Sequence, residues 1–238
     1  MAINQVEALE YCKGVIDPKE KNLTLGFINV LGGRMMAANR AMLVRCTPDT
    51  PINDGCMPVS NEAVKSGERD RKPQDMEARC ATPKADENVS IFLSASDGLK
   101  ATFKQWGNVF SLIKNNFRGS TKTGISIIEP TDKGLMCYSG GNAYPPQGLI
   151  YRLAECDKPK KQDYYWFNAK YWNDTCKILA DLNPKCVKIT FSKNAAVDII
   201  TDKDEMHIKF LGLRAGGAAA DNPEMWDFFR RTAGRESE

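Results

Sequence analysis

The order of expected strands and helices repeats once in the second half of the chain, and this repeat limits the possible folds more than any other feature. Apolar and polar side chains alternate over residues 89–95 as in a strand, an amphipathic helix follows, and turn residues separate three further strands. The same series begins again at residue 163, which indicates a fold built from copies of one unit. The full series is strand 89–95, helix 99–113, strands 124–130, 134–140 and 148–155, then strand 163–169, helix 170–182 and strands 186–192, 196–202 and 206–214.

The helix expected at 99–113 has a competing interpretation. Its apolar side chains recur at helical spacing, and Asp97 stands where an N-cap residue is expected. Gly107 and the Asp97-Gly98 pair are also typical of a β-hairpin. The sequence favours the helix and leaves the hairpin open.

The first half of the chain starts with a helix and continues with paired extended segments. Residues 3–16 carry an apolar stripe, and Pro18 ends this helix because the residue before a proline is pushed out of the helical region. Residues 23–31 and 34–46 are extended, and Gly32-Gly33 between them indicates a hairpin turn.

A charged connection separates the two halves. Residues 56–67 predict a strand and a short helix capped by Ser60. Residues 67–88 hold few large apolar groups and predict a surface connection with one strand at 76–81. We therefore expect an α+β chain with a first domain at 1–86, short for a complete set of strands, a second domain at 87–215, and a flexible tail with a short helix at 216–238.

The residue types that catalysis needs are scarce. No two of the eight cysteines have the close spacing of a metal knuckle, and the single histidine, His207, stands in an alternating apolar stretch that favours a structural role. Neither a GxxxxGK[ST] nor a GxGxxG motif occurs. We therefore expect a protein without enzymatic activity, cofactor or metal.

The sequence also bears on location. The N-terminus lacks a basic start followed by an apolar core, and no apolar run approaches the roughly 20 residues that cross a bilayer. We expect a cytoplasmic protein with no membrane contact.

Several segments resemble the DNA sliding clamps of bacterial type, a family built from repeated βαβββ units. Leu211-Gly212-Leu213-Arg214 stands at the place of the family's terminal M-P-x-R strand, and Asn168, Tyr171 and Trp172 match its N-x-x-Y-L helix entry. GRMMAANRAMLVRC is similar to the family's first hairpin, and CMPVSNEAVKSG to its V-P-A-x-x-L helix start. The chain departs from the pattern at the aspartate of the hairpin motif, where Asn39 and Asn142 lie near the expected places.

The resemblance implies a ring of six such domains around duplex DNA, with helices lining the hole and sheets forming the outer wall. Two domains per chain would make the ring a homotrimer. The implied function is a polymerase processivity factor, small and phage-encoded, with duplex DNA, a DNA polymerase and a clamp loader as partners. In a viral setting its location is the bacterial host cytoplasm.

Charge singles out the residues that would face the hole. No acidic residue occurs from Gly98 to Ile128, although this stretch holds five cations. A solvated helix face is the alternative explanation. The expected DNA-binding residues are Lys100, Lys104, Lys114, Arg118 and Lys122, with Lys170, Lys177, Lys13 and Lys65 as weaker candidates because acidic neighbours partly cancel some of them.

Two segments are expected to serve partner binding. In the family, short peptides of polymerase and loader enter an apolar pocket, and the residues here that would line it by position are Val197, Ile199, Leu211, Leu213 and Arg214. Each of them is alternatively a plain core residue. The tail sequence NPEMWDFF resembles the peptide itself, with Asn222, Met225, Phe228 and Phe229 as anchors, or else forms a helix packed on its own body. The competing function is a clamp-fold regulatory or structural protein, such as a transcription co-activator or clamp mimic, that does not encircle DNA.

Overall fold

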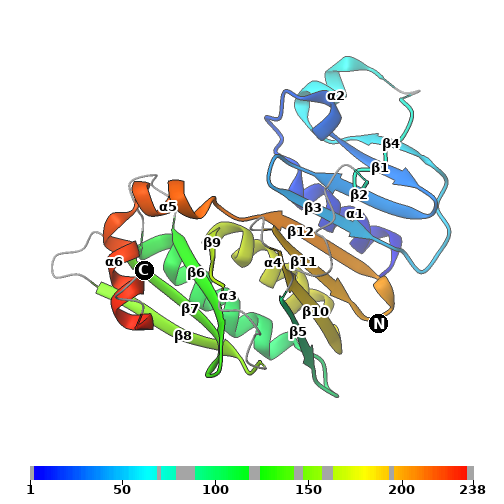
Figure 1. The fold of residues 1–238 in the computed structure, drawn as a ribbon. Helices are drawn as coiled ribbons and strands as arrows, with labels where there is room; N and C mark the ends of the chain where they lie inside the picture. The colour runs from blue at the N-terminus through cyan, green and yellow to red at the C-terminus, as the bar shows by residue number, and fades with distance from the viewer. Residues whose placement is uncertain are drawn as a thin grey trace.

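The computed structural model describes residues 3–68, 71–78, 89–117, 124–141, 147–156, 163–192 and 196–234. Within them, two antiparallel sheets are covered by helices (Figure 1). The eight-stranded sheet contains, in spatial order, β4 (Gly55–Pro58), β1 (Phe27–Leu31), β2 (Arg34–Ala38), β3 (Met42–Cys46), β12 (Met206–Leu211), β11 (Ala196–Thr201), β10 (Cys186–Phe191) and β5 (Val89–Ser94). The four-stranded sheet contains β8 (Gln147–Ala154), β7 (Gly134–Gly141), β6 (Ile125–Thr131) and β9 (Tyr165–Asn168).

Apart from the helix at Ala215–Asp221, which was not predicted, the helices lie at the positions that the sequence indicates. None in the described part of the chain is both long and apolar enough to span a membrane. They are α1 (Gln5–Val15), α2 (Asn61–Ser66), α3 (Lys100–Asn116), α4 (Ala169–Leu182), α5 (Ala215–Asp221) and α6 (Pro223–Ala233), with 3-10 turns at Leu23–Leu25 and Asp202–Asp204.

The predicted double series of strand, helix and three strands is confirmed from β5 to β12. The helix prediction at 99–113 is also confirmed, since α3 forms in place of the hairpin. Its cap differs from the expectation: Asp97 makes no capping bond, and the Lys100 amide instead donates to Asn183 Oδ1 at 2.9 Å. The Asn183 backbone also ends α4 in a left-handed conformation, so one residue closes α4 with its backbone and caps α3 with its side chain.

The N-terminal elements repeat the order of the elements from α3 to α4. α1-β1-β2-β3-β4-α2 follows the same order as α3-β6-β7-β8-β9-α4, and the strand order β4-β1-β2-β3 matches β9-β6-β7-β8. The described residues between α2 and β5 add no further strand. The predicted boundary at 86/87 lies outside the described residues, and the domain division stays a prediction.

Three segments of the N-terminal half differ in detail from the expected extended runs, and the first is residues 23–25, which form a 3-10 turn before β1. Residues 34–46 form two strands rather than one, because Asn39 Oδ1 accepts hydrogen bonds from the amides of Ala41 and Met42 and turns the chain. Residues 76–78 form a turn where a strand was expected, and the rest of that predicted strand lies outside the described residues.

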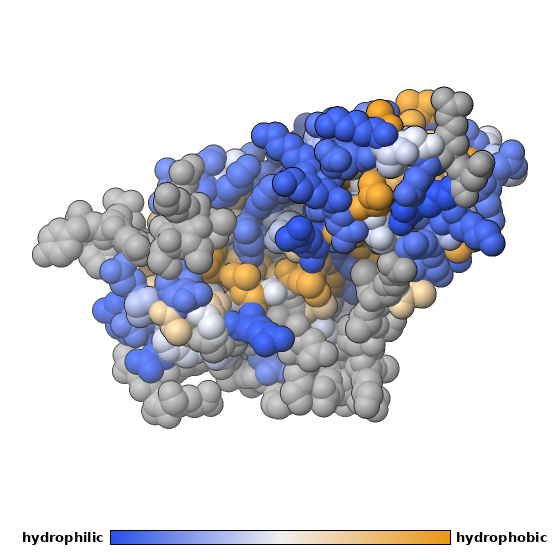
Figure 2. Space-filling view, turned by 90° about the horizontal axis from the view of Figure 1, so that it is seen from above, coloured by the Kyte–Doolittle hydropathy of each residue, from blue (hydrophilic) through white to orange (hydrophobic). Residues whose placement is uncertain are grey.

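Both sheets bury one face against the helices. Alternate strand residues, such as Val44 on β3, Cys137 on β7 and Ile199 on β11, join one continuous core with the apolar sides of α1, α3 and α4. The opposite, outer face is covered only locally. Figure 2 shows one view of the surface, in which hydrophilic residues predominate and hydrophobic ones gather in smaller groups.

Candidate nucleic-acid interface

The helices α3 and α4 lie side by side against the sheets and are held by aromatic contacts. The Trp172 ring stacks on Phe110 with 5.3 Å between centroids and meets Trp106 edge-on at 6.3 Å. Trp106 Nε1 donates to the Leu153 carbonyl at 2.8 Å and thereby fixes α3 to β8. With these faces buried, the remaining helix faces are open to solvent.

The open face of α3 carries lysines that form no ion pair within the part of the chain that the structure describes. Lys100 and Lys104 are exposed, one helical turn apart, and Lys114 is half-buried. None of the three forms an ion pair with another described residue, and α3 contains no acidic residue. The structure thus brings these three predicted residues onto one helix. Arg118 and Lys122 lie outside the described residues.

The weaker candidates on the other helices have acidic partners. Three of them pair within their own helix: Lys170 with Asp174 at 2.8 Å, Lys13 with Glu10 at 2.9 Å, and Lys65 with Glu62 at 3.5 Å. Lys177 is exposed on α4, a helix that also carries Asp174 and Asp181. Local pairing leaves little net charge on these helices, so α3 is the strongest anion-attracting element among them.

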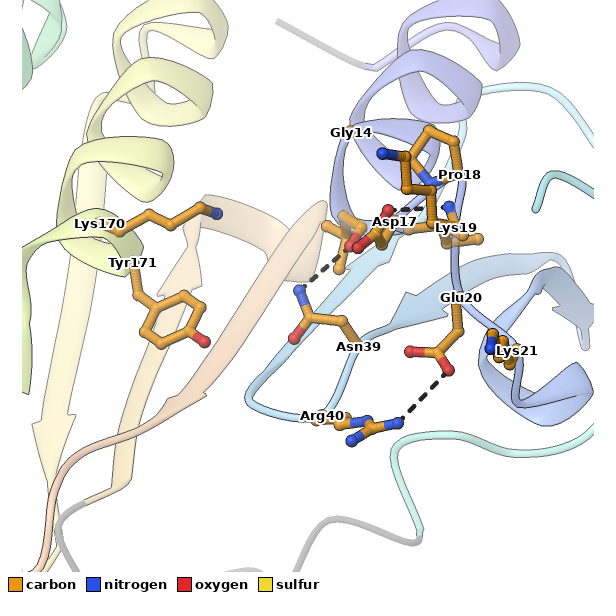
Figure 3. A pocket seen from close by; sticks show the side chains of 12 residues that line it. Gly14, Asp17, Pro18, Lys19, Glu20, Lys21, Asn39, Arg40, Lys170 and Tyr171 are labelled. Carbon is orange, nitrogen blue, oxygen red and sulfur yellow. Dashed lines mark hydrogen bonds and ion pairs between the residues drawn. The ribbon is translucent and has the colours of Figure 1, made fainter. Parts of the chain in front are cut away.

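A cavity of about 640 Å³ lies between the end of α1 and the start of α4, and we call it the junction cavity (Figure 3). Lys170 and Tyr171 face it from α4, and Lys19 and Lys21 line it from the segment after α1. Arg40 lines it from the β2–β3 turn, where Glu20 pairs with it at 3.8 Å.

The junction cavity was missed by the sequence reasoning. Lys19 and Lys21 are exposed and form no ion pair with another described residue. Four cations against the carboxylates of Asp17 and Glu20 give the lining a net positive charge. The run Asp17-Pro18-Lys19-Glu20-Lys21 shows a mixed charge pattern, and only the fold brings Arg40 and Lys170 beside it.

Two of the residues predicted to line the partner-binding pocket do not lie at the outer surface. Val197 and Ile199 are completely buried on the inner face of β11, in the main core. The alternation along β11 points them toward the helices, so a peptide on the outer surface would not contact them. Their interpretation as core residues is the correct one.

The other three pocket residues lie where the chain passes from one sheet to the other. The Leu211 amide donates to the Ala41 carbonyl at 2.8 Å, and the Leu213 amide donates to the Trp166 carbonyl at 2.7 Å. The Leu211 side chain is 54% exposed, Arg214 is exposed, and Leu213 is half-buried. These residues are accessible at the surface.

The predicted tail forms two helices, and α6 packs on the outer face of the four-stranded sheet. Gly216 and Gly217 belong to α5 rather than to an extended hinge. The buried Met225 and Phe229 join what we call the tail cluster, which consists of Ile125, Ile127, Tyr138, Trp166, Ala218, Met225 and Phe229. Phe229 meets Tyr138 edge-on at 5.1 Å between centroids.

The remaining tail anchors complete this packing. Phe228 lies against Gly140 and Gly148, a cross-strand pair of β7 and β8 whose missing side chains leave room for its ring. Asn222 precedes α6, is buried, and donates to the Ala218 carbonyl at 3.0 Å. A cavity of about 310 Å³ between α5 and β6 is lined by Leu213, Arg214 and Asn222 among others. The tail thus lies next to the accessible residues 213 and 214.

Two antiparallel sheets, built from strand–helix–three-strand units and lined on one face by helices, define a DNA-clamp fold. The structural comparisons agree with this assignment. The β subunit of the DNA polymerase of Streptococcus pyogenes matches 88% of this chain and 63% of its own length, with a TM-score of 0.60 and 12% identity. A sliding clamp of Pseudomonas aeruginosa solved with griselimycin matches 90% of this chain and 64% of its own, with a TM-score of 0.63 and 14% identity.

The sliding clamp of Bacillus subtilis gives a similar result, covering 88% of this chain and 62% of its own, with a TM-score of 0.60 and 12% identity. The chain therefore has the fold of bacterial DNA sliding clamps, as its sequence resemblance predicted, and spans about 63% of the length of such a clamp. No protein-family model and no curated protein matches the sequence.

Proposed function

We propose that this protein is a DNA sliding clamp: a ring that encircles duplex DNA, tethers a DNA polymerase to its template and has no chemistry of its own. The observation that carries the proposal is the unpaired positive face of α3 on a clamp fold. Duplex DNA presents a dense row of phosphates, and exposed lysines bind it by releasing its counterions without reading sequence. Contact of this kind permits sliding.

Oligomerisation would close the ring. Because each chain matches about 63% of a bacterial clamp subunit, three copies would together match close to two such subunits. We therefore propose a homotrimer. We also propose that the protein is phage-encoded and acts in the cytoplasm of the bacterial host.

Partners would bind near the accessible residues at the end of β12. We propose that Leu211, Leu213 and Arg214 contact peptides of the polymerase and the clamp loader, since they combine apolar surface with a cation. The packed tail lies next to them. It would compete with such a peptide only if α6 and the peptide share the same surface.

The first experiment measures the assembly. Mass determination in solution, followed by particle imaging, should give about three times the chain mass of 26.5 kDa and a central hole. A stable monomer at micromolar concentration would contradict the ring.

A second experiment measures the DNA contact. Reversing Lys100 and Lys104 to Glu should reduce the slope of log affinity against log salt by roughly 1.8, because each phosphate contact contributes about 0.9. The comparison pair is Lys13→Glu with Lys65→Glu, two weaker candidates that already have acidic partners and should reduce the slope less. A slope unchanged by the Lys100 and Lys104 reversals would remove α3 from the DNA path.

A third experiment removes the tail. Deleting residues 218–238 uncovers Ile125, Ile127, Tyr138 and Trp166 and should lower the free energy of unfolding. Titration with one polymerase-derived peptide then separates two roles. Tighter binding after deletion would identify the tail as a competitor, whereas unchanged affinity would leave it a purely structural cover.

One observation favours the alternative, a clamp-fold regulatory protein that does not encircle DNA. Among the described residues, the N-terminal half has counterparts of β6 to β9 but none of β10 to β12. In a ring, the first domain of a neighbouring chain would therefore offer the edge of β8 no strand that corresponds to β12. A monomer or an open dimer that still binds a polymerase or a transcription factor would support this alternative.

A further inference from the structure

The junction cavity has a preformed frame to which both halves of the chain contribute. Asn39 Nδ2 donates to the Val15 carbonyl at 3.1 Å and ties the β2–β3 turn to the end of α1. The Pro18 carbonyl accepts from the Asn61 amide at 2.9 Å, which holds the segment after α1 against the start of α2. The first turn of α4 forms the opposite wall (Figure 3). The charged side chains of the lining therefore stand on backbone that hydrogen bonds fix in place.

The two carboxylates of the lining are held by the segment to which they belong. Asp17 Oδ1 accepts from the Lys19 amide at 2.8 Å, and Glu20 Oε1 accepts from the Asn22 amide at 2.8 Å. The Glu20 side chain is only 10% exposed. Both carboxylates are thus directed to backbone amides, and neither forms an ion pair with Lys19 or Lys21.

The cations of the same wall remain accessible. The Arg40 side chain is 81% exposed, although Glu20 lies 3.8 Å away. Lys19 and Lys21 are exposed as well. Four cationic and two acidic side chains line the cavity, which leaves a net charge of +2. A cavity with this charge attracts anions, and a guanidinium can donate to two oxygens of one phosphate at once.

The wall formed by α4 adds a hydroxyl donor and the fourth cation. Tyr171 is half-buried, its ring lies 6.3 Å from that of Phe210, and its hydroxyl forms no hydrogen bond with another described residue. Lys170 Nζ pairs with Asp174 at 2.8 Å and lies 5.5 Å from the centre of the Tyr171 ring. Both residues stand on the first turn of the helix, where the macrodipole is positive. An anion in the cavity can therefore accept a hydrogen bond from Tyr171 while it contacts the cations of the other wall.

We propose that the junction cavity binds a phosphate group with its attached sugar, and that the bound phosphate joins the two halves of the chain. The volume of about 640 Å³ is typical of sites for small ligands and exceeds what a bare phosphate fills. Arg40, Lys19 and Lys21 contact the phosphate oxygens from one wall, and Tyr171 donates to them from the other. Because such a ligand binds only the folded chain, it also raises the free energy of unfolding.

Two ligands present this chemistry: a backbone phosphate of DNA and a free nucleotide. With DNA as the source, the inference rests on the proposed clamp function and adds to it a phosphate contact at the junction, built from other residues than the lysines of α3. With a free nucleotide as the source, the site is independent of ring formation.

Tyr171→Phe is the most informative variant, because it removes one hydroxyl and no charge. Since that hydroxyl has no hydrogen-bond partner in the described part of the chain, the free energy of unfolding should stay unchanged. The affinity for the phosphate ligand should fall about two- to tenfold, as expected for one lost hydrogen bond. General electrostatic attraction cannot produce this loss, because the charge of the protein is the same.

A second variant removes charge from the cavity. Arg40→Gln with Lys19→Gln should weaken binding roughly tenfold, since hydrogen bonds to charged groups are lost. The matched control is Lys72→Gln with Lys133→Gln, which removes two exposed lysines that do not line the cavity and form no ion pair with a described residue. This control changes the net charge equally and should have a much smaller effect.

Two probes, titrated at low ionic strength, distinguish the sources. Deoxyadenosine monophosphate tests the free nucleotide, and a short duplex oligonucleotide tests the DNA backbone. Weaker duplex binding by both cavity variants identifies DNA as the source, and an effect on the monophosphate alone identifies a free nucleotide. If neither probe is affected more than in the control, the proposal is overturned. Failure of the clamp function would appear separately, as a monomer in the mass determination, and would leave the monophosphate titration unchanged.

Discussion

Replacing Gly148 by Ala is the most direct test of how α6 packs on the four-stranded sheet. A Cβ at Gly148 would lie 2.0 Å from Phe228 Cε2 and 2.1 Å from Cζ, whereas ordinary contact begins at 3.4 Å. The Phe228 ring or the whole of α6 must therefore move by more than about 1 Å. Overpacking of this degree costs about 1–3 kcal/mol.

The opposing contribution is small. An alanine in a strand is favoured over glycine by roughly 0.5–1 kcal/mol because it loses less backbone entropy on folding. The net expectation for Gly148→Ala is a loss of about 0.5–2 kcal/mol in the free energy of unfolding. Gly140→Ala is the matched control, since its Cβ would lie 3.2 Å from the same ring and needs only a slight shift.

A double-mutant cycle measured by urea unfolding isolates the contact. In a Phe228→Ala background the obstructing ring is gone, and Gly148→Ala should become neutral or slightly stabilising. Trp226, which packs against Trp166 and Tyr164, provides a fluorescence signal for the tail. An equal loss in both backgrounds would mean that Phe228 does not lie on Gly148, and the packed position of α6 would be wrong.

Three further predictions concern other parts of the chain. Leu213→Ala with Arg214→Ala should weaken binding of polymerase peptides and leave the oligomer intact, at a cost of about 1–2 kcal/mol for the half-buried leucine; loss of assembly alongside binding would identify a structural strand instead. Asn183→Ala should cost about 2 kcal/mol by removing the α3 cap and straining a left-handed residue, and Asn183→Gly about 1 kcal/mol because only the cap is lost; equal costs in calorimetry would contradict this. Burial raises the pKa of the Cys137 thiol well above its usual range, so at pH 8 an alkylating reagent should label the exposed Cys186 and leave Cys137 unmodified until the protein unfolds.

The sequence was sufficient to predict the elements because their patterns are local. The strand and helix order from β5 to β12, the Gly32-Gly33 turn and the Ser60 cap depend on residues close in sequence, and all are present in the structure. The cap of α3 was not predictable, because Asn183 reaches it from 83 positions away.

The candidate site was predictable only where its residues lie close together in the sequence. The charge of α3 is visible in a continuous stretch without acidic residues, whereas the junction cavity combines segments that are distant in sequence. Val197 and Ile199 were misplaced because alternation gives two faces of a strand without telling which one meets solvent.

The pairing of β3 with β12 has a consequence for synthesis of the chain. Cys46 and Met206 lie opposite each other in this pair and are 160 positions apart. At roughly 5–20 residues per second, a ribosome needs about 8–32 s to add the residues between them. During that time the nascent N-terminal strands present an open, apolar edge, so the newly made chain is a candidate for chaperone binding and for aggregation at high expression levels.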